Sequence, residues 1–384
     1  MAGGHELTLA VRAVGLNFRD VLNVLGEYPG DPGPPGSDCS GVVEAVGVEV
    51  HHLLAGDAAF GFAHAPLACA VVTAGWQLCA KPCALSFEQA STLPSTWSTV
   101  HVAFTRPQVR AGARALLHAA AGGVGLVGVE YALWLGARAY GSAGRPSKHA
   151  ALVAAGLRHR LSSRESVAFG HGVARLLCGG RLHAVLNSLS NDFISASWAA
   201  LGEGGWLEEV GKRGVWSAGR QAAAAVAALY HVIAIDTDMS LAPDSVLVAL
   251  SQLSRRANLG VVHSLPLRAF ELEHQYESAF RLLQSGRNLG KVVVRPTTSS
   301  DRRDEGTSTH VLTGGTGGLG LLTARWLGQR GASCVVLASR SGTPAASAAA
   351  EWAQLLQLPT EVRVARCDAA EPSGARWLIT QAQA

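Results

Sequence analysis

Two glycine-rich turns are the segments of this chain whose residue types and spacing could do chemistry. The first, Ala119 to Gly125, reads AAAGGVG, and the second, Thr313 to Gly320, reads TGGTGGLG. Each follows a short apolar run and precedes a helical stretch, so each lies where a strand would turn into a helix. Glycine lets the backbone bend tightly, and a helix N-terminus offers unpaired N–H groups to a phosphate. The turns therefore predict two sites for a dinucleotide pyrophosphate, although each could be an ordinary turn between strand and helix.

The residues predicted to contact the cofactor at these turns are Ala121, Gly122, Gly123, Val124 and Gly125 in the first, and Gly314, Gly315, Thr316, Gly317, Gly318, Leu319 and Gly320 in the second.

The elements that must position the turns follow an α/β pattern. Short β-like runs broken by Gly and Pro fill residues 6–107, which predicts a compact β-rich domain. From residue 110 to about residue 238, strand and helix signals alternate, as is typical of a doubly wound parallel sheet. An amphipathic helix and a strand within residues 261–296 are expected to return to the β-rich domain.

Composition bounds the class of protein. With 384 residues, 48% hydrophobic and 16% charged, the chain can bury cores in two or three domains. A net charge of +4, without a basic run interleaved with aromatic residues, argues against nucleic-acid binding. An acidic small ligand or partner stays compatible with this balance.

The seven cysteines show no metal-ligand spacing, and their odd number suggests reduced thiols in the cytosol. No secretory leader and no apolar span long enough for a membrane helix is evident in the sequence. We therefore expect a soluble, cytoplasmic protein that binds neither metal nor membrane.

Six motifs, in order, resemble the enoyl reductase domain of modular (type I) polyketide synthases and animal-type fatty acid synthases. They are GLNFRDVL at 15–22, YPG at 28–30, GSDCSG at 36–41, HAAAGGVG at 118–125, LNSL at 186–189 and GK at 290–291. The second glycine turn and SRSG at 339–342 resemble the opening of the ketoreductase domain that follows in such synthases.

This resemblance implies an α/β fold: a zinc-free medium-chain reductase followed by the start of a second Rossmann domain of the short-chain reductase type. The implied domains are a GroES-like β-rich domain at 1–107, a Rossmann domain at 108–240, a return to the first domain at 241–296, a linker at 297–308 and a truncated ketoreductase unit at 309–384. The opening strands of the first domain and the catalytic Ser, Tyr and Lys of the ketoreductase are expected to be missing.

The resemblance also implies an activity. NADPH would reduce the double bond of an α,β-unsaturated acyl thioester carried on the phosphopantetheine arm of an acyl carrier protein, beside other synthase domains. Two alternatives stay open: a free-standing quinone or alkenal reductase, and a structural fragment of a synthase that no longer turns over.

Cofactor choice is predicted at the end of the second strand of the first Rossmann unit. Residues 140–148 contain no acid to bind ribose hydroxyls but two bases, so Ser142, Arg145 and Lys148 suit a 2′-phosphate. The alternative is that Lys148 only begins a solvated helix. In the second unit, Arg340 follows the strand at 334–338 and is likewise suited to the 2′-phosphate of NADPH.

The family suggests Lys212, Asp236 and Tyr28 as the catalytic residues. Lys212 would supply a proton with Asp236 as its partner, and Tyr28 would protonate the α-carbon and influence its stereochemistry. The alternatives are a solvated strand-end lysine, a turn aspartate and a packing tyrosine. Further residues expected at the cofactor are Asn17, Asn187, Ser188, Gly211 and Lys291.

Overall fold

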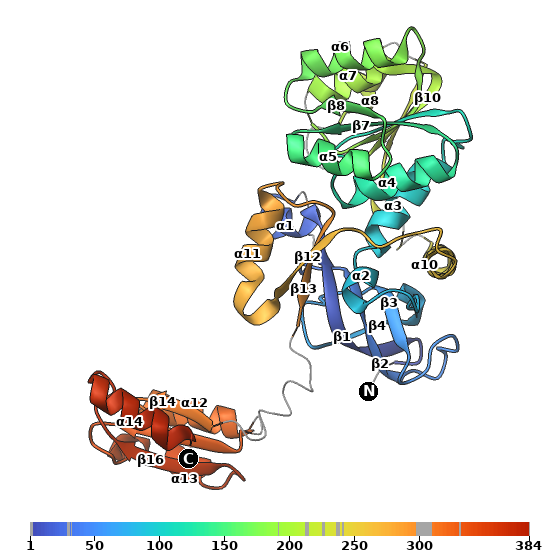
Figure 1. Cartoon of the computed structure of the whole chain (residues 1–384). Coiled ribbons are helices and arrows are strands. Elements are labelled where there is room, and N and C mark those ends of the chain that lie inside the picture. Colours follow the sequence, from blue (N-terminus) through green and yellow to red (C-terminus); the bar gives the residue numbers. More distant parts are fainter. Residues whose placement is uncertain are drawn as a thin grey trace. The chain divides into compact units, whose positions relative to one another are not determined.

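The computed structural model describes residues 3–28, 31, 33–190, 192–211, 215–224, 227–235, 239, 242–296, 309–329 and 332–383. The chain divides into two compact units, Met1–Pro296 and Thr297–Ala384 (Figure 1). Each unit has hydrophobic clusters of its own. The predicted linker at 297–308 lies outside the described residues.

A mixed seven-stranded sheet forms the β-rich part of the first unit. Its order is β12-β13-β1-β2-β3-β5, and β4 also pairs with β1. Burial alternates along the first half of β1, which places Leu7, Leu9 and Val11 in the core. Strand β13 pairs antiparallel with β1, so the segment after residue 260 completes this sheet. The strands are β1 (Glu6–Leu16), β2 (Asp38–Val46), β3 (Ala58–Phe62), β4 (Ala70–Ala74), β5 (Leu78–Ala80), β12 (Leu267–Glu271) and β13 (Lys291–Arg295).

Six parallel strands form the second sheet of this unit, in the order β11-β10-β9-β6-β7-β8. They are β6 (Arg114–Leu117), β7 (Arg138–Ala143), β8 (His159–Ser162), β9 (Leu182–Asn187), β10 (Leu201–Glu209) and β11 (Leu229–Val232). The order reverses between β6 and β9, which is the doubly wound arrangement whose carboxyl edge receives ligands.

Helices cover both faces of this parallel sheet (Figure 1). Helices α4 (Gly123–Trp134) and α5 (Pro146–Ala154) pack on one face, while α6 (Ser166–Leu177) and α7 (Asp192–Ala200) pack on the other. The remaining helical elements of the unit are α1 (Phe18–Val24), η1 (Gly75–Gln77), α2 (Phe87–Ala90), α3 (Pro94–Thr105), α8 (Ala218–Ala223), α10 (Pro243–Asn258) and α11 (Leu272–Gln284).

Helix α3 lies within the stretch that the sequence predicts as β-rich. Most of its side chains are buried, including the polar Thr96, Ser98 and Thr99. A helix buried around most of its circumference has no amphipathic stripe, so periodicity could not reveal it.

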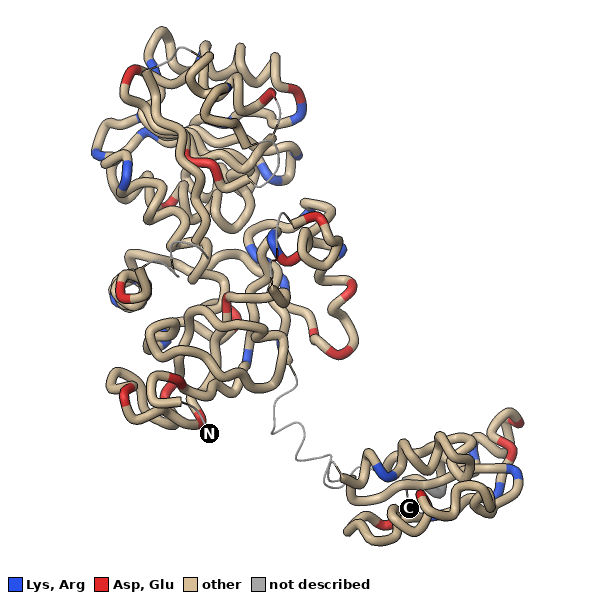
Figure 2. The backbone as a smooth tube through the Cα atoms, turned by 180° about the vertical axis from the view of Figure 1, so that it is seen from behind, with Lys and Arg blue, Asp and Glu red and all other residues tan. Residues whose placement is uncertain are grey.

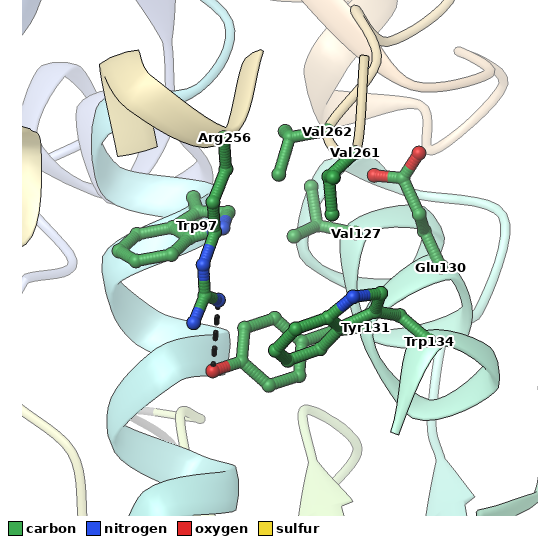
Figure 3. Close-up of a pocket in the computed structure, with 8 residues that line it drawn as sticks. All are labelled: Trp97, Val127, Glu130, Tyr131, Trp134, Arg256, Val261 and Val262. Atoms are coloured by element: carbon green, nitrogen blue, oxygen red, sulfur yellow. Dashed lines mark hydrogen bonds between the residues drawn. The ribbon is translucent and has the colours of Figure 1, made fainter. Parts of the chain in front are cut away.

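An aromatic cage attaches α10 to α3 and α4 (Figure 3). The guanidinium of Arg256 lies 5.6 Å from the ring centroid of Trp97, 5.6 Å from that of Tyr131 and 4.4 Å from that of Trp134. Only about 10 Å³ remains open in the pocket that these side chains line. That is room for one water at most, so Arg256 itself fills the cage.

The second unit is a three-stranded parallel sheet with the order β14-β15-β16. One face packs against α12 and α13 through Leu321, Leu337 and Leu355, and the other packs against α14 through Leu378. Its elements are β14 (Thr309–Thr313), α12 (Gly318–Gln329), β15 (Cys334–Ser339), η3 (Ala346–Ala348), α13 (Ala349–Leu355), β16 (Glu361–Arg366) and α14 (Pro372–Gln383).

Charges of both signs are dispersed through each unit (Figure 2). Among the described residues, no helix is both long enough and apolar enough to cross a lipid bilayer.

Candidate active site

The first glycine turn joins β6 to α4 at the carboxyl edge of the parallel sheet. Ala119 adopts a left-handed conformation with φ 46°, and its carbonyl accepts the N–H of Gly122 at 2.8 Å. Gly122 caps α4 without a side chain, so the helix N-terminus keeps N–H groups for a ligand. A Cβ on Gly125 would lie 2.4 Å from Ala120 Cα, which means that only glycine lets the helix start this close to the strand.

His118, just before this turn, is buried and bonded through both ring nitrogens. Its Nδ1 lies 2.9 Å from Ser142 Oγ, and its Nε2 lies 2.7 Å from Ser197 Oγ. Burial lowers the pKa of His118 to about 3, so the ring is neutral at ordinary pH. The network ties the ends of β6 and β7 to α7 beneath the turn.

Ser142 is fully buried, and its hydroxyl is engaged by His118. The structure therefore separates it from Arg145 and Lys148, which follow β7 nearer the surface. Burial, and then the charge of Arg145, lower the pKa of Lys148, so the two cations lie within electrostatic reach of each other. Neither forms an ion pair with any residue in the described ranges, which leaves both for an anion.

Arg164 is a third cation at this edge that sequence reasoning missed. Its Nε donates to the carbonyl of Gly144, directly before Arg145, from the loop after β8. A usable signal was present, because the carboxyl ends of adjacent parallel strands meet at one edge of a sheet.

A buried ion pair from the β-rich sheet reaches the same turn. Lys291 Nζ donates to Asp38 Oδ2 at 3.0 Å and to Asn17 Oδ1 at 2.7 Å, while Asn17 Nδ2 also donates to Asp38 Oδ2. A Cβ on Gly123 would lie 3.0 Å from Lys291 Cδ. Asn17 and Lys291 are thus brought together beside the glycine turn. Their ionic partner, Asp38, lies in the GSDCSG motif, where sequence reasoning gave it no role.

Ser95, on the first turn of α3, completes this cluster. Its backbone N–H donates to Asp38 Oδ1 at 3.1 Å, and its hydroxyl bonds the same oxygen. The Asp38 carboxylate therefore receives donors on both of its oxygens.

Of the three residues predicted to be catalytic, the structure describes only Tyr28. Tyr28 is half-buried, and the guanidinium of Arg19 lies 5.5 Å from its ring centroid. Lys212 and Asp236 lie outside the described residues. Gly211 lies directly before that gap, and its N–H donates to Glu209.

Asn187 ends β9 at the same edge and Ser188 follows it, but the two differ in exposure. Ser188 is exposed. Asn187 is fully buried, and its amide donates to Leu189 O at 2.7 Å and to Glu209 Oε2 at 2.6 Å. Both amide hydrogens are therefore used within the protein, so this side chain shapes the edge rather than offering a donor to a ligand.

The second glycine turn repeats the construction of the first within its own unit. Gly314 is left-handed with φ 66°, and its carbonyl accepts the N–H of Gly317 at 3.1 Å. A Cβ on Gly320 would lie 2.6 Å from Gly315 Cα, the counterpart of the contact between Gly125 and Ala120. Arg340 is exposed after β15, Thr316 is buried and Leu319 is 79% exposed.

Within the described ranges, no group of three or more His, Cys, Asp or Glu side chains could hold a metal ion.

Comparisons with known proteins agree with this architecture. The Alcohol dehydrogenase GroES-like domain family matches residues 3–102, the Zinc-binding dehydrogenase family matches residues 156–294, and the KR domain family matches residues 308–384. The chain is 33% identical over 395 aligned residues, 98% of its length, to a phenolphthiocerol/phthiocerol polyketide synthase from Mycobacterium tuberculosis. It spans 18% of that relative.

Among solved structures, the CurK enoyl reductase is similar with a TM-score of 0.73 and 31% identity, over 77% of this chain and 92% of that one. The chain belongs to the polyketide synthase enoyl reductase family. Its last part is the opening of a KR domain. At 23% identity, an Escherichia coli quinone oxidoreductase complexed with NADPH shares the fold, with a TM-score of 0.70 over 77% of this chain and 93% of that one.

The predicted family and the predicted medium-chain reductase fold, GroES-like and Rossmann parts followed by the start of a second Rossmann domain, are therefore confirmed.

The buried His118 of this enoyl reductase unit predicts a pH-dependent stability. As pH falls below the ordinary histidine pKa of 6.5, the unfolded chain takes up a proton that the folded chain, with a pKa of about 3, refuses. Stability should therefore fall by up to about 1.4 kcal/mol per pH unit below that point. Urea unfolding between about pH 5 and about pH 8 should show this slope, and His118→Gln should reduce it.

His51→Gln, at an exposed histidine, is the matched control and should leave the slope unchanged. An identical pH dependence in the wild type and His118→Gln would show that this histidine is not the responsible group.

Proposed function

We propose that the chain is an NADPH-dependent enoyl reductase that acts on an enoyl thioester carried by an acyl carrier protein within a polyketide or fatty acid synthase. The observation that carries the proposal is the meeting of the glycine turn with the Lys291 cluster at Gly123, in a member of this family. At this junction the glycine turn, where the pyrophosphate would bind, meets the β-rich sheet, which would bind the substrate.

The residues present fit a phosphorylated dinucleotide. The uncapped N-terminus of α4 suits the pyrophosphate, and the close contacts around Gly123 and Gly125 leave backbone where a side chain would intrude. Arg145 and Lys148 suit a 2′-phosphate, because a doubly charged anion would relieve their mutual repulsion. When bound, the cofactor supplies the hydride for the β-carbon of the substrate.

In this proposal the protein's own groups handle the proton and the developing charge. Lys212 donates a proton toward the α-carbon or stabilises the enolate, with Asp236 orienting it. Tyr28 protonates from another direction and so influences the configuration of a substituted α-carbon. The Arg19 guanidinium lies over the Tyr28 ring and helps to hold it in place.

The proposal is tested by substrate choice. Purified chain should oxidise NADPH in the presence of crotonyl-pantetheine, a soluble substitute for the carrier-bound thioester, and should be slower with a simple quinone. The reason is that the proposed acid serves an enolate, which quinone reduction does not form. Faster turnover of the quinone would favour the free-standing reductase, and no turnover of either would favour an inactive fragment.

A second prediction concerns the cofactor. Each charge-assisted contact with a 2′-phosphate contributes about 1.5–3 kcal/mol, so NADPH should bind at least about ten- to a hundredfold more tightly than NADH. Lys148→Ala should erode this ratio by weakening NADPH alone, as measured by fluorescence titration with both cofactors.

Ser142→Ala is the informative control. Because the Ser142 hydroxyl is engaged by His118, its loss should lower stability and leave the NADPH to NADH ratio unchanged. Equal affinities for the two cofactors in the wild type would contradict the assignment of Arg145 and Lys148.

A third prediction separates proton delivery from hydride delivery. Lys212→Ala should leave NADPH affinity nearly unchanged but lower turnover by about a hundred- to ten-thousandfold. Tyr28→Phe should alter the configuration at a methyl-bearing α-carbon more than the rate. Single-turnover reduction of a 2-methyl-enoyl thioester, followed by chiral analysis of the product, measures both effects. Near-native turnover in Lys212→Ala would remove Lys212 and Asp236 from the mechanism.

A further inference from the structure

Two consecutive glutamates, Glu208 and Glu209, end β10 and are fully buried. Neighbouring residues of a strand point to opposite faces of the sheet, so the two carboxylates have different surroundings. Glu208 Oε2 lies 3.7 Å from Arg106 Nη1 and 3.9 Å from His231 Nδ1. Glu209 is instead surrounded by hydrogen-bond donors at the carboxyl edge of the sheet.

The Glu209 carboxylate ties together three adjacent strands. Its Oε2 accepts from Asn187 Nδ2, the last residue of β9, at 2.6 Å and from the Tyr230 hydroxyl on β11 at 3.3 Å. Its Oε1 accepts from the N–H of Gly211, just beyond β10, at 2.6 Å. Burial chiefly, and the Glu209 charge as well, raise the pKa of Tyr230 to about 12, so this phenol remains a donor. These donors offset the cost of burying the carboxylate.

The backbone directly after β10, at Gly211, lies close against this carboxylate. A Cβ on Gly211 would lie 2.5 Å from Glu209 Oε1, so a larger residue at position 211 would displace this carboxylate from its present position. On the other side, the Asn187 amide also donates to Leu189 O. The Glu209 carboxylate therefore positions the backbone at Gly211 directly and that at Leu189 through Asn187.

The strand order of the sheet indicates which half of a dinucleotide lies beside Leu189 and Gly211. A dinucleotide lies across the carboxyl edge where strand order reverses, here between β6 and β9. The cations Arg145 and Lys148 follow β7, on one side of that point, and would take the adenosine phosphate end. Leu189 and Gly211 follow β9 and β10, on the other side, and so face the nicotinamide end.

We propose that Glu209 is a positioning residue whose carboxylate holds the backbone next to β9 and β10, at Leu189 and Gly211, in the position that accepts the nicotinamide half of the cofactor. The inference rests on the proposed NADPH site, and it adds a requirement for a charge that does not touch the ligand. A glutamine in its place presents an N–H₂ group to donors, so it cannot satisfy Asn187, Tyr230 and Gly211 together.

The test compares two probes with the full chain. NADPH reports the whole site, and adenosine 2′,5′-bisphosphate reports the adenosine phosphate end alone. Glu209→Gln should weaken NADPH about tenfold and change the bisphosphate affinity by less than about twofold. Glu208→Gln is the matched control, because it removes the same charge from an equally buried residue of the same strand. It should leave both affinities unchanged. The second unit is unchanged in every variant, so differences in affinity between variants arise in the first unit.

Equal weakening of both probes in Glu209→Gln, or the same selective loss in Glu208→Gln, would overturn the proposal. Should Glu209→Gln fail to fold, Tyr230→Phe removes one donor from the Glu209 carboxylate and should give the same selective loss of NADPH affinity; its absence would also overturn the proposal. These binding measurements need no turnover. A wild type inactive on enoyl thioesters would defeat the proposed function while leaving the role of Glu209 to be decided by the two probes.

Discussion

The buried ion pair between Lys291 and Asp38 is the interaction on which the first unit depends most. Lys291 begins β13, and Asp38 begins β2, so one contact fixes two strands of the β-rich sheet. Ser95 adds the first turn of α3, and the lysine stem lies against the glycine turn of the parallel sheet. Removing one partner of such a pair leaves an uncompensated buried charge and costs about 3–5 kcal/mol. The geometry of the first glycine turn is thereby coupled to β13, a strand that comes late in this unit.

The sequence predicted those parts of the structure that local residue types determine. Both glycine turns lie between a strand and a helix, and the same left-handed position is occupied by Ala119 in one and Gly314 in the other. The strand predicted at 334–338 is β15, Cys334–Ser339, because an apolar run bounded by turn residues is a local signal. Helix α3 was missed because its polar Thr and Ser residues are buried by long-range packing, which a local pattern does not record.

The predicted site residues also divide into those that local motifs indicate and those that depend on long-range packing. Asn17, Lys291 and the turn glycines were identified by motif and lie together, whereas Ser142 and Asn187 face inward to His118 and Glu209. Residue type alone does not say which way a strand-end side chain points. Asp38, Arg164 and Glu209 were missed for the complementary reason, since their importance arises only when separate strands are brought to one edge. Lys212 and Asp236 remain predictions.

Helix α4 connects two features that otherwise look unrelated. It begins at the glycine turn and carries Tyr131 and Trp134 into the cage around Arg256 near its other end (Figure 3). Twelve helical residues make a stiff rod about 18 Å long, so its two ends cannot rotate independently. Turning the rod would separate a cation from its aromatic rings, at about 0.5–2 kcal/mol for each ring. The orientation of α4 at the glycine turn is therefore stabilised from its far end, where contact with α10 opposes rotation of the helix about its own axis.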